Sequence, residues 1–409
     1  MRLLSLLALI LLVPSLLNGC GGVEVKDRNI QPSPSKDQQS RKLFNHTNSR
    51  EALAQKRVKL FIGQDLNSIR DYVKTGKYPK PAGVTTYLSF YNLMSENFPA
   101  YGGLGIDRRG YPTSGSVDWG AGPLNALALA KEYPDTALNI GLSIAEGNQS
   151  TVWVEGGLKA ISEGKHNSEI NHLARFFKSI DNPIFLRIGY EFDGVWNKGY
   201  ENTQDYIEAY KHIVDVLRAK QVQNVAFVWQ ASASPIDDIV ESKRENIQDW
   251  YPGDAYVDWL GFSWFLPPDK AVKGSATQRG LANEVLQFAR QKRKPVIIAE
   301  ASPQGYDLGK LLKSNISPLW DGVSGKASRQ VSASELWVEW FTPFFTFIRS
   351  NADVIKAVAY INADWDSQAL WSVPYANGYW GDSRVQINQD ISKRWLSEIS
   401  DESFWEYGQ

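Results

Sequence analysis

The feature that most constrains the fold is a series of eight short β-rich runs, separated by helical patterns, within residues 56–400. Several of the runs, such as 294–300 (KPVIIAE), are almost continuously apolar, which is typical of strands that are buried on both faces. The eight runs are 57–62, 84–91, 137–144, 183–189, 224–230, 257–264, 294–300 and 354–361.

The segments between these runs show the periodicity of amphipathic helices. In the segment 168–180, Ile170, Leu173, Phe177 and Ile180 fall on one helical face. Residues 203–220 repeat the pattern. Eight strands that alternate with helices over roughly 340 residues predict an α/β fold, a (β/α)8 TIM barrel. A doubly wound open sheet is the competing architecture.

The N-terminus has the pattern of a targeting segment. The first 20 residues, MRLLSLLALILLVPSLLNGC, carry one positive charge, then an apolar run, then Leu-Asn-Gly-Cys. They resemble a bacterial lipoprotein signal, which implies that residues 1–19 are removed and that Cys20 is lipidated. Gly21 follows the cysteine, where the inner-membrane retention signal has Asp, so we expect the outer membrane.

The next segment separates this targeting segment from the domain. Residues 20–55 are polar, contain Pro, Ser and Gln, and lack apolar periodicity, which predicts a flexible linker between the lipid and the domain. Residues 56–409 are expected to form one barrel domain, and we expect it to be a monomer.

Composition excludes several classes of function. The net charge of −1 argues against nucleic acid, which favours a basic surface. Cys20 is the only cysteine, so thiol catalysis in the domain is excluded, and the four histidines show no metal-ligand spacing. Because G-x-S-x-G and phosphate-loop motifs are also absent, the sequence predicts a hydrolase without a metal or other cofactor. The aromatic content of 12% suits either a large core or the stacking of sugar rings.

In a barrel of this kind the active site lies at the C-terminal ends of the strands. The fourth run leads into Glu191 and Asp193, and the seventh ends at Glu300, so the two glutamates should face each other across the barrel mouth. Two opposed carboxyl groups are the arrangement that cleaves a glycosidic bond. The other strand ends offer Glu146, Gln230, Trp264, Asn362, Asp364 and Trp365.

Four segments carry a resemblance to a known family. LRIGYEFDGVWN, NVAFVWQASAS, WYPGDAYVDWLGFSWF and KPVIIAEAS are similar to segments of the clan A retaining glycoside hydrolases. Within that clan the chain is most similar to glycoside hydrolase family 26, which includes β-mannanases and some β-glucanases and xylanases. The resemblance implies that Glu191 is the acid/base, Glu300 the nucleophile, Arg187 their electrostatic support and Trp365 a sugar platform.

Two positions depart from the family pattern. Tyr190 stands where the family has His, and Trp264 and Phe265 stand where the clan has a Tyr that hydrogen-bonds the nucleophile. Tyr190 or Tyr306 could supply the missing hydroxyl. The residues expected to bind the substrate are Arg187, Tyr190, Trp196, Trp264, Tyr306 and Trp365.

The expected function is that of a retaining endo-β-glycosidase acting on a polysaccharide such as β-mannan or β-glucan. Long aromatic segments after the second and eighth runs favour endo action, because they offer rings for several sugar units. The alternative is a surface glycan-binding lipoprotein that keeps the barrel without turnover, and the missing strand-six Tyr favours it.

Overall fold

The computed structural model describes residues 49–94, 101–113, 115–145, 147, 152–194, 196–235, 246–269, 276–314 and 328–408. Cys20, the linker up to residue 48 and Glu146 lie outside these ranges, so the predictions made for them stay predictions. Within the described ranges, no helix combines the length and apolarity that a membrane crossing requires.

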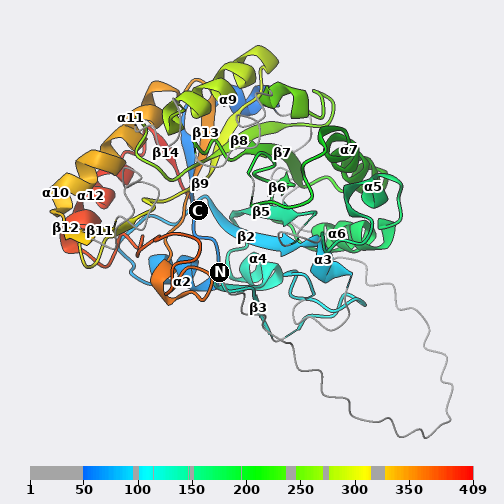
Figure 1. The fold of residues 1–409 in the computed structure, drawn as a ribbon, viewed down its shortest axis with the longest axis horizontal. Helices are drawn as coiled ribbons and strands as arrows, with labels where there is room; N and C mark the ends of the chain where they lie inside the picture. Colours follow the sequence, from blue (N-terminus) through cyan, green and yellow to red (C-terminus); the bar gives the residue numbers. More distant parts are fainter. Residues whose placement is uncertain are drawn as a thin grey trace, which may run out of the picture. The chain divides into compact units, whose positions relative to one another are not determined.

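Eight parallel strands form a closed barrel (Figure 1). Each strand pairs with the next around the barrel, and the last strand pairs with the first, so the sheet has no open edge between them. The barrel strands are β1 (Val58–Ile62), β2 (Gly83–Ser89), β5 (Ala137–Ser143), β6 (Ile184–Ile188), β7 (Val225–Ala231), β8 (Trp259–Trp264), β9 (Val296–Ala301) and β13 (Ile355–Tyr360). This closure confirms the predicted (β/α)8 barrel and excludes the open sheet.

Helices surround the strands, as Figure 1 shows for α7, α9 and α11. The predicted apolar face of α6 is confirmed, because Ile170, Leu173 and Phe177 are all buried. The described helices are α1 (Ser49–Ala54), α2 (Leu66–Val73), α3 (Phe90–Leu93), α4 (Ala126–Glu132), α5 (Gly157–Ser162), α6 (Asn167–Ser179), α7 (Thr203–Ala219), α9 (Gln278–Lys292), α10 (Ala333–Leu336), α11 (Thr342–Ser350) and α12 (Gln389–Ile399).

Short elements complete the fold. β3 (Val117–Asp118) and β4 (Pro123–Leu124) form a hairpin within the long segment that follows β2. A second small sheet contains β10 (Tyr306–Asp307), β11 (Leu312–Ser314) and β12 (Ser328–Gln330), and β14 (Trp405–Glu406) pairs with β1. The remaining helical turns are η2 (Ile247–Trp250), the π-helical turn η3 (Trp337–Phe341) and η4 (Trp365–Ser367).

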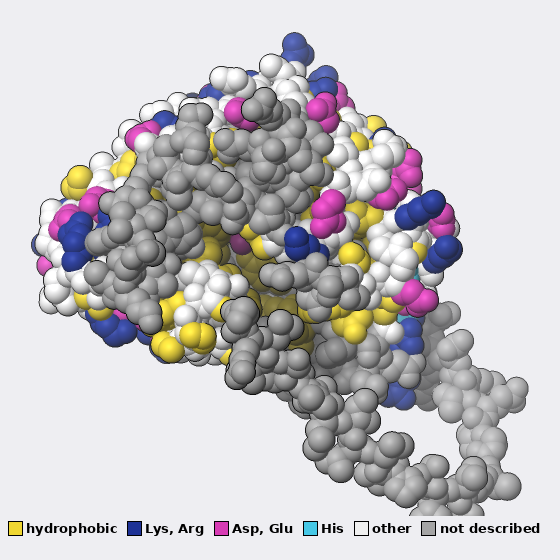
Figure 2. Space-filling model, viewed as in Figure 1, with side chains coloured by type: hydrophobic (Ala, Val, Ile, Leu, Met, Phe, Trp, Pro, Cys, Tyr) yellow, Lys and Arg dark blue, Asp and Glu magenta, His cyan; other side chains and the backbone are white. Residues whose placement is uncertain are grey.

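The barrel interior is apolar around Phe185 and polar nearer the C-terminal ends of the strands. Phe185 packs edge-on against Phe61 and Trp259, with ring centroids 5.3 and 4.9 Å apart. Side chains two residues further along a strand point to the same side, so the inward position after Phe185 is Arg187. The apolar floor therefore supports a layer of polar side chains nearer the C-terminal ends of the strands. The face shown in Figure 2 is hollowed near its middle, where hydrophobic side chains are visible.

Candidate active site

Four neighbouring strands direct polar side chains into the upper part of the barrel. They are Arg187 on β6, Gln230 on β7, Ser263 on β8 and Glu300 on β9. All four side chains are buried, and each forms a hydrogen bond or ion pair to another member of the group. Strands of a closed barrel are rigid supports, so these groups are held in a fixed geometry.

A β-bulge in β9 turns Glu300 into the barrel. Ile297 and Ala299 pack in the interior cluster, so simple alternation would point Glu300 outward. Phe262 of β8 pairs with Ile298, however, and the next residue of β8 pairs with Glu300, which leaves one extra residue on β9. Because of this extra residue, the side chains that follow it point to the opposite face of the sheet, and Glu300 faces the interior.

The bulge is held from across the barrel. The side-chain amide of Asn139, on β5, donates a 3.1 Å hydrogen bond to the carbonyl oxygen of Ala299. A bulge disrupts the hydrogen-bond ladder, so this contact gives a buried carbonyl the partner it needs. Sequence reasoning missed Asn139, although a buried amide inside an apolar run is a visible signal.

Glu191 sits on a tight turn just beyond the end of β6. Its φ angle is +51°, in the left-handed region that costs a residue with a Cβ roughly 1 kcal/mol or more. Two hydrogen bonds hold the turn: the Glu191 amide donates to the Gln230 carbonyl (3.0 Å), and Asn197 Nδ2 donates to the Glu191 carbonyl (2.8 Å). The turn brings the carboxyl group of Glu191 within hydrogen-bond distance of Ser263, inside the barrel.

A continuous chain of hydrogen bonds joins the two glutamates. Ser263 Oγ donates to Glu191 Oε1 (2.6 Å) and accepts from Gln230 Nε2 (3.0 Å). Gln230 Nε2 also approaches Glu300 Oε1 at 3.2 Å. Arg187 pairs with the same Glu300 oxygen and donates to Gln230 Oε1 (2.9 Å). One amide and one hydroxyl therefore link the two carboxyl groups.

Trp196 supplies the second donor to Glu191. Its indole Nε1 donates to Glu191 Oε2 at 2.9 Å, while 46% of the residue stays exposed. Gly194 makes this position possible, because a Cβ there would lie 2.4 Å from the Trp196 ring. Trp196 thus lies beside Glu191, where sequence reasoning expected a residue that binds the substrate.

The surroundings of Glu191 favour its protonated form. Burial raises the pKa of its carboxyl group, the nearby negative charge of Glu300 raises it further, and the result is a pKa of about 8. The hydrogen bonds from Ser263 and Trp196 act in the opposite direction, because they stabilise the carboxylate. Glu300 instead has Arg187 as a direct counter-ion. One carboxyl group is therefore suited to donate a proton and the other to carry a negative charge.

Two tyrosines flank the arginine of this layer. The guanidinium carbon of Arg187 lies 5.0 Å from the ring centroid of Tyr87 and 5.2 Å from that of Tyr190. Tyr190, the residue before Glu191, therefore lies beside the layer of polar side chains that contains Arg187 and Glu300. Tyr87, on β2, was missed by sequence reasoning, because the run 84–91 shows no feature that separates it from its neighbours.

The prediction for Trp264 is wrong. The side chains of β8 alternate, and because Ser263 faces the interior, Trp264 faces the helices. It is fully buried there, with its ring centroid 4.7 Å from that of Phe347 and 6.0 Å from that of Phe344 in α11. It is a core residue and cannot bind a sugar.

The prediction for Tyr306 is also wrong. This residue is buried in β10, and its hydroxyl donates to Glu339 in η3. Its hydroxyl is therefore engaged outside the barrel interior, and Arg187 and Gln230 are the donors that Glu300 receives instead.

Trp365 and Asp193 are both buried. Trp365 follows β13, as expected, but it is 3% exposed and packs against Trp371 and Trp380 at ring-centroid distances of 5.2 and 4.8 Å. Its role as a sugar platform stays a prediction. Asp193 is buried and accepts a 2.6 Å hydrogen bond from the amide of Ser232, so it ties the turn after β6 to the end of β7.

Comparison with known proteins identifies related sequences. Residues 156–294 match the family model described as glycosyl hydrolase family 26. The chain is 36% identical over 345 residues to the beta-1,3-xylanase TXYA of a Vibrio species, covering 84% of this chain and 65% of that protein. It is 34% identical over 349 residues to a beta-1,3-xylanase of an Alcaligenes species, covering 85% and 64%. The chain thus spans slightly less than two thirds of the length of these relatives.

Solved structures share the fold. A family 26 β-mannanase from Bacteroides ovatus has a TM-score of 0.55 at 14% identity, covering 91% of this chain and 96% of that one. A modular endo-β-1,4-mannanase from Cellulomonas fimi has a TM-score of 0.53 at 13% identity, covering 88% and 75%. The chain therefore contains a segment, residues 156–294, that matches glycosyl hydrolase family 26, set in a (β/α)8 barrel like those of solved family 26 enzymes.

Proposed function

We propose that this protein is a retaining endo-β-glycosidase whose substrate is a β-1,3-xylan. The observation that carries the activity is the pair of carboxyl groups, Glu191 and Glu300, linked by hydrogen bonds yet placed in opposite electrostatic surroundings. The xylan is chosen over the β-mannan or β-glucan expected from sequence, because the relatives above 30% identity are named β-1,3-xylanases. The likeness to mannanases is one of fold.

The geometry supports a double displacement. Both donors to Glu300 engage Oε1, and Oε2 receives no hydrogen bond from the described residues. Oε2 attacks the anomeric carbon as the bond to the leaving oxygen breaks, and Glu191 transfers its proton to that oxygen. A water molecule then attacks the same carbon, Glu191 accepts the water proton, and the bond to Glu300 breaks.

The hydrogen bonds around the pair prepare it for these steps. Arg187 and Gln230 fix the rotation of the Glu300 carboxylate, so little reorganisation is needed before attack. Ser263 and Trp196 fix the orientation of Glu191 in the same way. When Glu191 loses its proton, these two donors stabilise the carboxylate that forms. The expected separation of the two carboxyl groups is that of retaining enzymes, about 5–5.5 Å.

Hydrolysis assays with three glutamate variants test the mechanism. Glu300→Ala should abolish release of reducing sugar from β-1,3-xylan, and added azide should restore turnover as a glycosyl azide of inverted configuration. Glu191→Ala should slow the hydrolysis of substrates with poor leaving groups far more than that of activated aryl glycosides, whose leaving groups scarcely need protonation. Glu208→Ala, an exposed position on α7, is the matched control and should keep the wild-type rate. An NMR time course in which the first product has inverted configuration would refute the proposal.

The second candidate is a glycan-binding protein without turnover. One observation favours it: Glu300 lacks the tyrosine hydrogen bond expected in this clan, because Trp264 faces the helices and the Tyr306 hydroxyl donates to Glu339. The donors Arg187 and Gln230 argue for the enzyme, because a binding protein has no need to position a nucleophile. Xylan, mannan, β-1,3-glucan and mixed-linkage glucan should be tested together. Binding to one of them without sugar release would decide for the second candidate.

We also propose that the domain is attached to a bacterial membrane, in the outer membrane where the cell has one, through acyl chains on Cys20. The support is the Leu-Asn-Gly-Cys sequence and the polar segment that follows it. Cys20→Ser should move the full-length protein from the membrane fraction to the soluble fraction while its specific activity stays the same. Unchanged fractionation of that variant would refute the anchor.

A further inference from the structure

The inner side of β5 holds a buried amide beneath the layer of polar side chains. Ala137 packs in the interior cluster that contains Phe185, so Asn139, two residues further along β5, also faces the interior. Asn139 is 0% exposed and pairs in register with Phe185 of β6. Arg187, a member of the polar layer, lies two residues nearer the C-terminal end of β6. The Asn139 amide is therefore at the level of the apolar ring of Phe185, below the polar layer.

The side chain of Asn139 spans the barrel. β5 and β9 are four strands apart in both directions around the ring of eight strands, so they face each other across the interior. Asn139 Nδ2 donates to the carbonyl oxygen of Ala299 on β9 (3.1 Å) and to Thr85 Oγ1 on β2 (3.2 Å). A side-chain amide nitrogen has two hydrogens to donate, so both are engaged. Asn139 therefore connects a neighbouring strand to the strand that carries Glu300.

The acceptor on β9 is the residue that makes the bulge. Ile298 and Glu300 pair with consecutive residues of β8, which leaves Ala299 as the extra residue between them. The register of β9 with β13 also shifts between Ile298 and Ala301. The carbonyl of Ala299 and the backbone nitrogen of Glu300 belong to one planar peptide group. A hydrogen bond that fixes this carbonyl therefore fixes the backbone from which the Glu300 side chain leaves.

Packing alone does not account for this amide. Asn139 Oδ1 is buried and has no hydrogen-bond partner among the described residues. A buried acceptor without a partner is destabilising, so an apolar side chain of the same size would suit the surrounding apolar cluster better. The compensating gain lies in the two hydrogen bonds that Nδ2 donates, one of which reaches the backbone next to Glu300.

The next inward position of β5 is a glycine, which leaves room for the polar layer. A Cβ on Gly141 would lie 2.6 Å from the Tyr87 ring and 3.0 Å from Arg187 Nη2. The space above Asn139 is thus taken by the tyrosine ring and by the guanidinium group that pairs with Glu300. β5 therefore reaches Glu300 through the backbone of β9 and not through a side chain of its own at that level.

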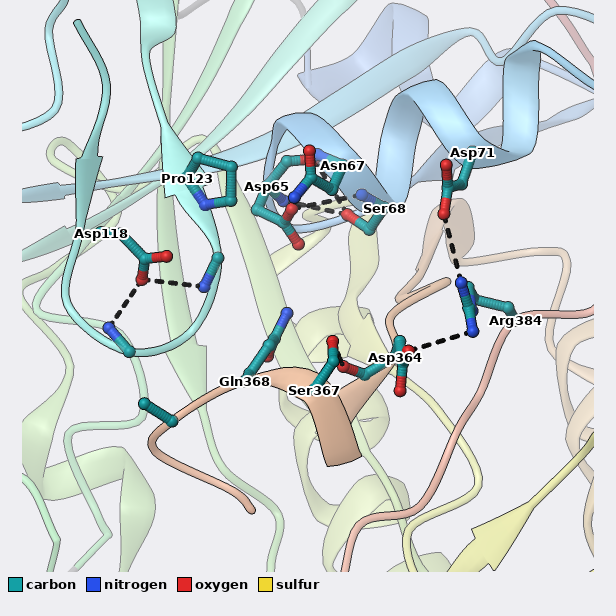
Figure 3. Close-up of a pocket in the computed structure, with 13 residues that line it drawn as sticks. Asp65, Asn67, Ser68, Asp71, Asp118, Pro123, Asp364, Ser367, Gln368 and Arg384 are labelled. Atoms are coloured by element: carbon teal, nitrogen blue, oxygen red, sulfur yellow. Dashed lines mark hydrogen bonds and ion pairs between the residues drawn. The ribbon is translucent and has the colours of Figure 1, made fainter.

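The support for the bulge comes from the barrel interior. A polar cavity of about 630 Å³ also opens at this end of the barrel, lined by residues that follow β1 and β13 and by the β3–β4 hairpin (Figure 3). The bulge residues Ile298, Ala299 and Glu300 are not among the described residues that line this cavity. The contact between Asn139 and the Ala299 carbonyl is therefore separate from it.

We propose that Asn139 is a positioning residue for the nucleophile. It holds the bulged peptide group between Ala299 and Glu300 in place. The Glu300 carboxylate then meets Arg187 and Gln230 through Oε1 and keeps Oε2 free to attack the anomeric carbon. The proposal rests on the proposed function, in which Glu300 is the nucleophile, and Asn139 acts through the backbone of β9 without touching the reacting atoms.

The rate of covalent labelling of Glu300 separates this role from a structural one. The reagent is the dinitrophenyl glycoside of β-1,3-xylobiose, fluorinated at the carbon next to the anomeric carbon. The Glu300 carboxylate attacks the anomeric carbon, dinitrophenolate leaves with the bonding electron pair, and the fluorine slows hydrolysis of the glycosyl ester that forms. Because dinitrophenolate leaves without a proton, the labelling rate does not depend on Glu191 as an acid.

Asn139→Leu keeps the size of the side chain but removes the donor. The maximal labelling rate, followed by mass spectrometry, should fall about 10- to 100-fold, because a displacement of about 1 Å at a reacting group can cost about 100-fold. The reagent concentration that gives half the maximal rate should stay near the wild-type value, because the groups that bind the sugar are unchanged.

Asn182→Leu is the matched control. Asn182 is also a buried amide, and its Nδ2 donates to the carbonyl oxygens of Tyr133 and Thr136, both at 2.9 Å. It precedes β6, so it lies at the opposite end of the barrel from the carboxyl groups. Both variants should have a lower melting temperature than the wild type, but only Asn139→Leu should be labelled more slowly. Equal labelling rates in the two variants would overturn the proposal.

A second variant guards against misfolding of the first. Asn139→Ala removes the same donor without placing an apolar group against the Ala299 carbonyl. Its labelling should be about three- to tenfold slower than that of the wild type, because a water molecule can replace part of the lost hydrogen bond. A wild-type labelling rate in Asn139→Ala would also overturn the proposal.

The two proposals fail in different ways. If the wild type is labelled only by the corresponding mannose or glucose reagent, the proposed substrate is wrong, and the role of Asn139 is tested with that reagent. If no reagent labels the wild type, the proposed function fails, but a crystal structure of Asn139→Leu still tests the positioning. Loss of the ion pair between Arg187 and Glu300 in that structure would support the role of Asn139, and an unchanged ion pair would refute it.

Discussion

Removal of the Ser263 hydroxyl should shift the pH dependence of hydrolysis to higher pH. Ser263 Oγ donates a 2.6 Å hydrogen bond to Glu191 inside the barrel. A donor stabilises the ionised carboxyl group, so this bond lowers the pKa of Glu191 relative to what burial and the charge of Glu300 would produce. In Ser263→Ala the bond is lost, and the pKa of Glu191 should rise above its present value of about 8.

The magnitude follows from the energy of the bond. A hydrogen bond to a charged group contributes about 1.5–3 kcal/mol, and one pKa unit corresponds to about 1.36 kcal/mol. Complete loss would therefore raise the pKa by about 1–2 units. Trp196 remains as a donor and water can enter the space left by the hydroxyl, so we expect a shift near the lower end, about 1 unit.

The assay is the pH profile of kcat/KM, whose alkaline limb reports the pKa of the acid in the free enzyme. The limb should move from about pH 8 to about pH 9 in Ser263→Ala. Ser302→Ala is the matched control, because Ser302 Oγ is buried and has no hydrogen-bond partner among the described residues. An alkaline limb that stays in place or moves to lower pH in Ser263→Ala would refute this account of Glu191.

Three further predictions follow from the packing and charges around the site. Trp264→Ala should lower the free energy of unfolding in urea by about 3–5 kcal/mol, as expected for a buried aromatic ring, and a loss of substrate affinity without a loss of stability would contradict its placement. Gly194→Ala should displace the Trp196 ring from Glu191. Hydrolysis of oligosaccharides should then be about tenfold slower, while hydrolysis of activated aryl glycosides should change less. Equal effects on the two kinds of substrate would contradict this. Because the pKa of Glu191 is raised by folding, the native state binds its proton more tightly, and stability should fall as pH rises from about 4.5 to about 8. Glu191→Gln should flatten this fall, and identical pH–stability curves for variant and wild type would count against the raised pKa.

The barrel could be predicted from the sequence because its signals are local. Continuous apolar runs and helical periodicity depend on neighbours within one element, and all eight runs became barrel strands within a few residues of their expected ends. The placement of Glu191 and Glu300 near the ends of β6 and β9 followed from the same runs. In a parallel barrel the C-terminal ends of all strands lie at the same end, so two carboxyl groups that follow strands and face the interior lie near the same mouth.

The sequence could not decide which side chains face the barrel interior, because this depends on contacts between residues far apart in the chain and on the alternation of side chains in each strand. Ser263 and Trp264 are adjacent, yet only Ser263 faces the barrel interior, because alternation assigns neighbours to opposite faces. The bulge that turns Glu300 inward exists only in the pairing of β9 with its neighbours.

Long-range contacts decided the rest of the site. Tyr306 was a plausible partner for Glu300 by distance along the chain, but the small sheet that contains it directs its hydroxyl to Glu339. The donors that do reach Glu300 come from Arg187 and Gln230, 113 and 70 residues earlier. The sequence by itself determined which strands form and where their carboxyl groups stand. The tertiary structure decided which donors meet those groups, because hydrogen-bond partners are chosen by the register of neighbouring strands and not by spacing along the chain.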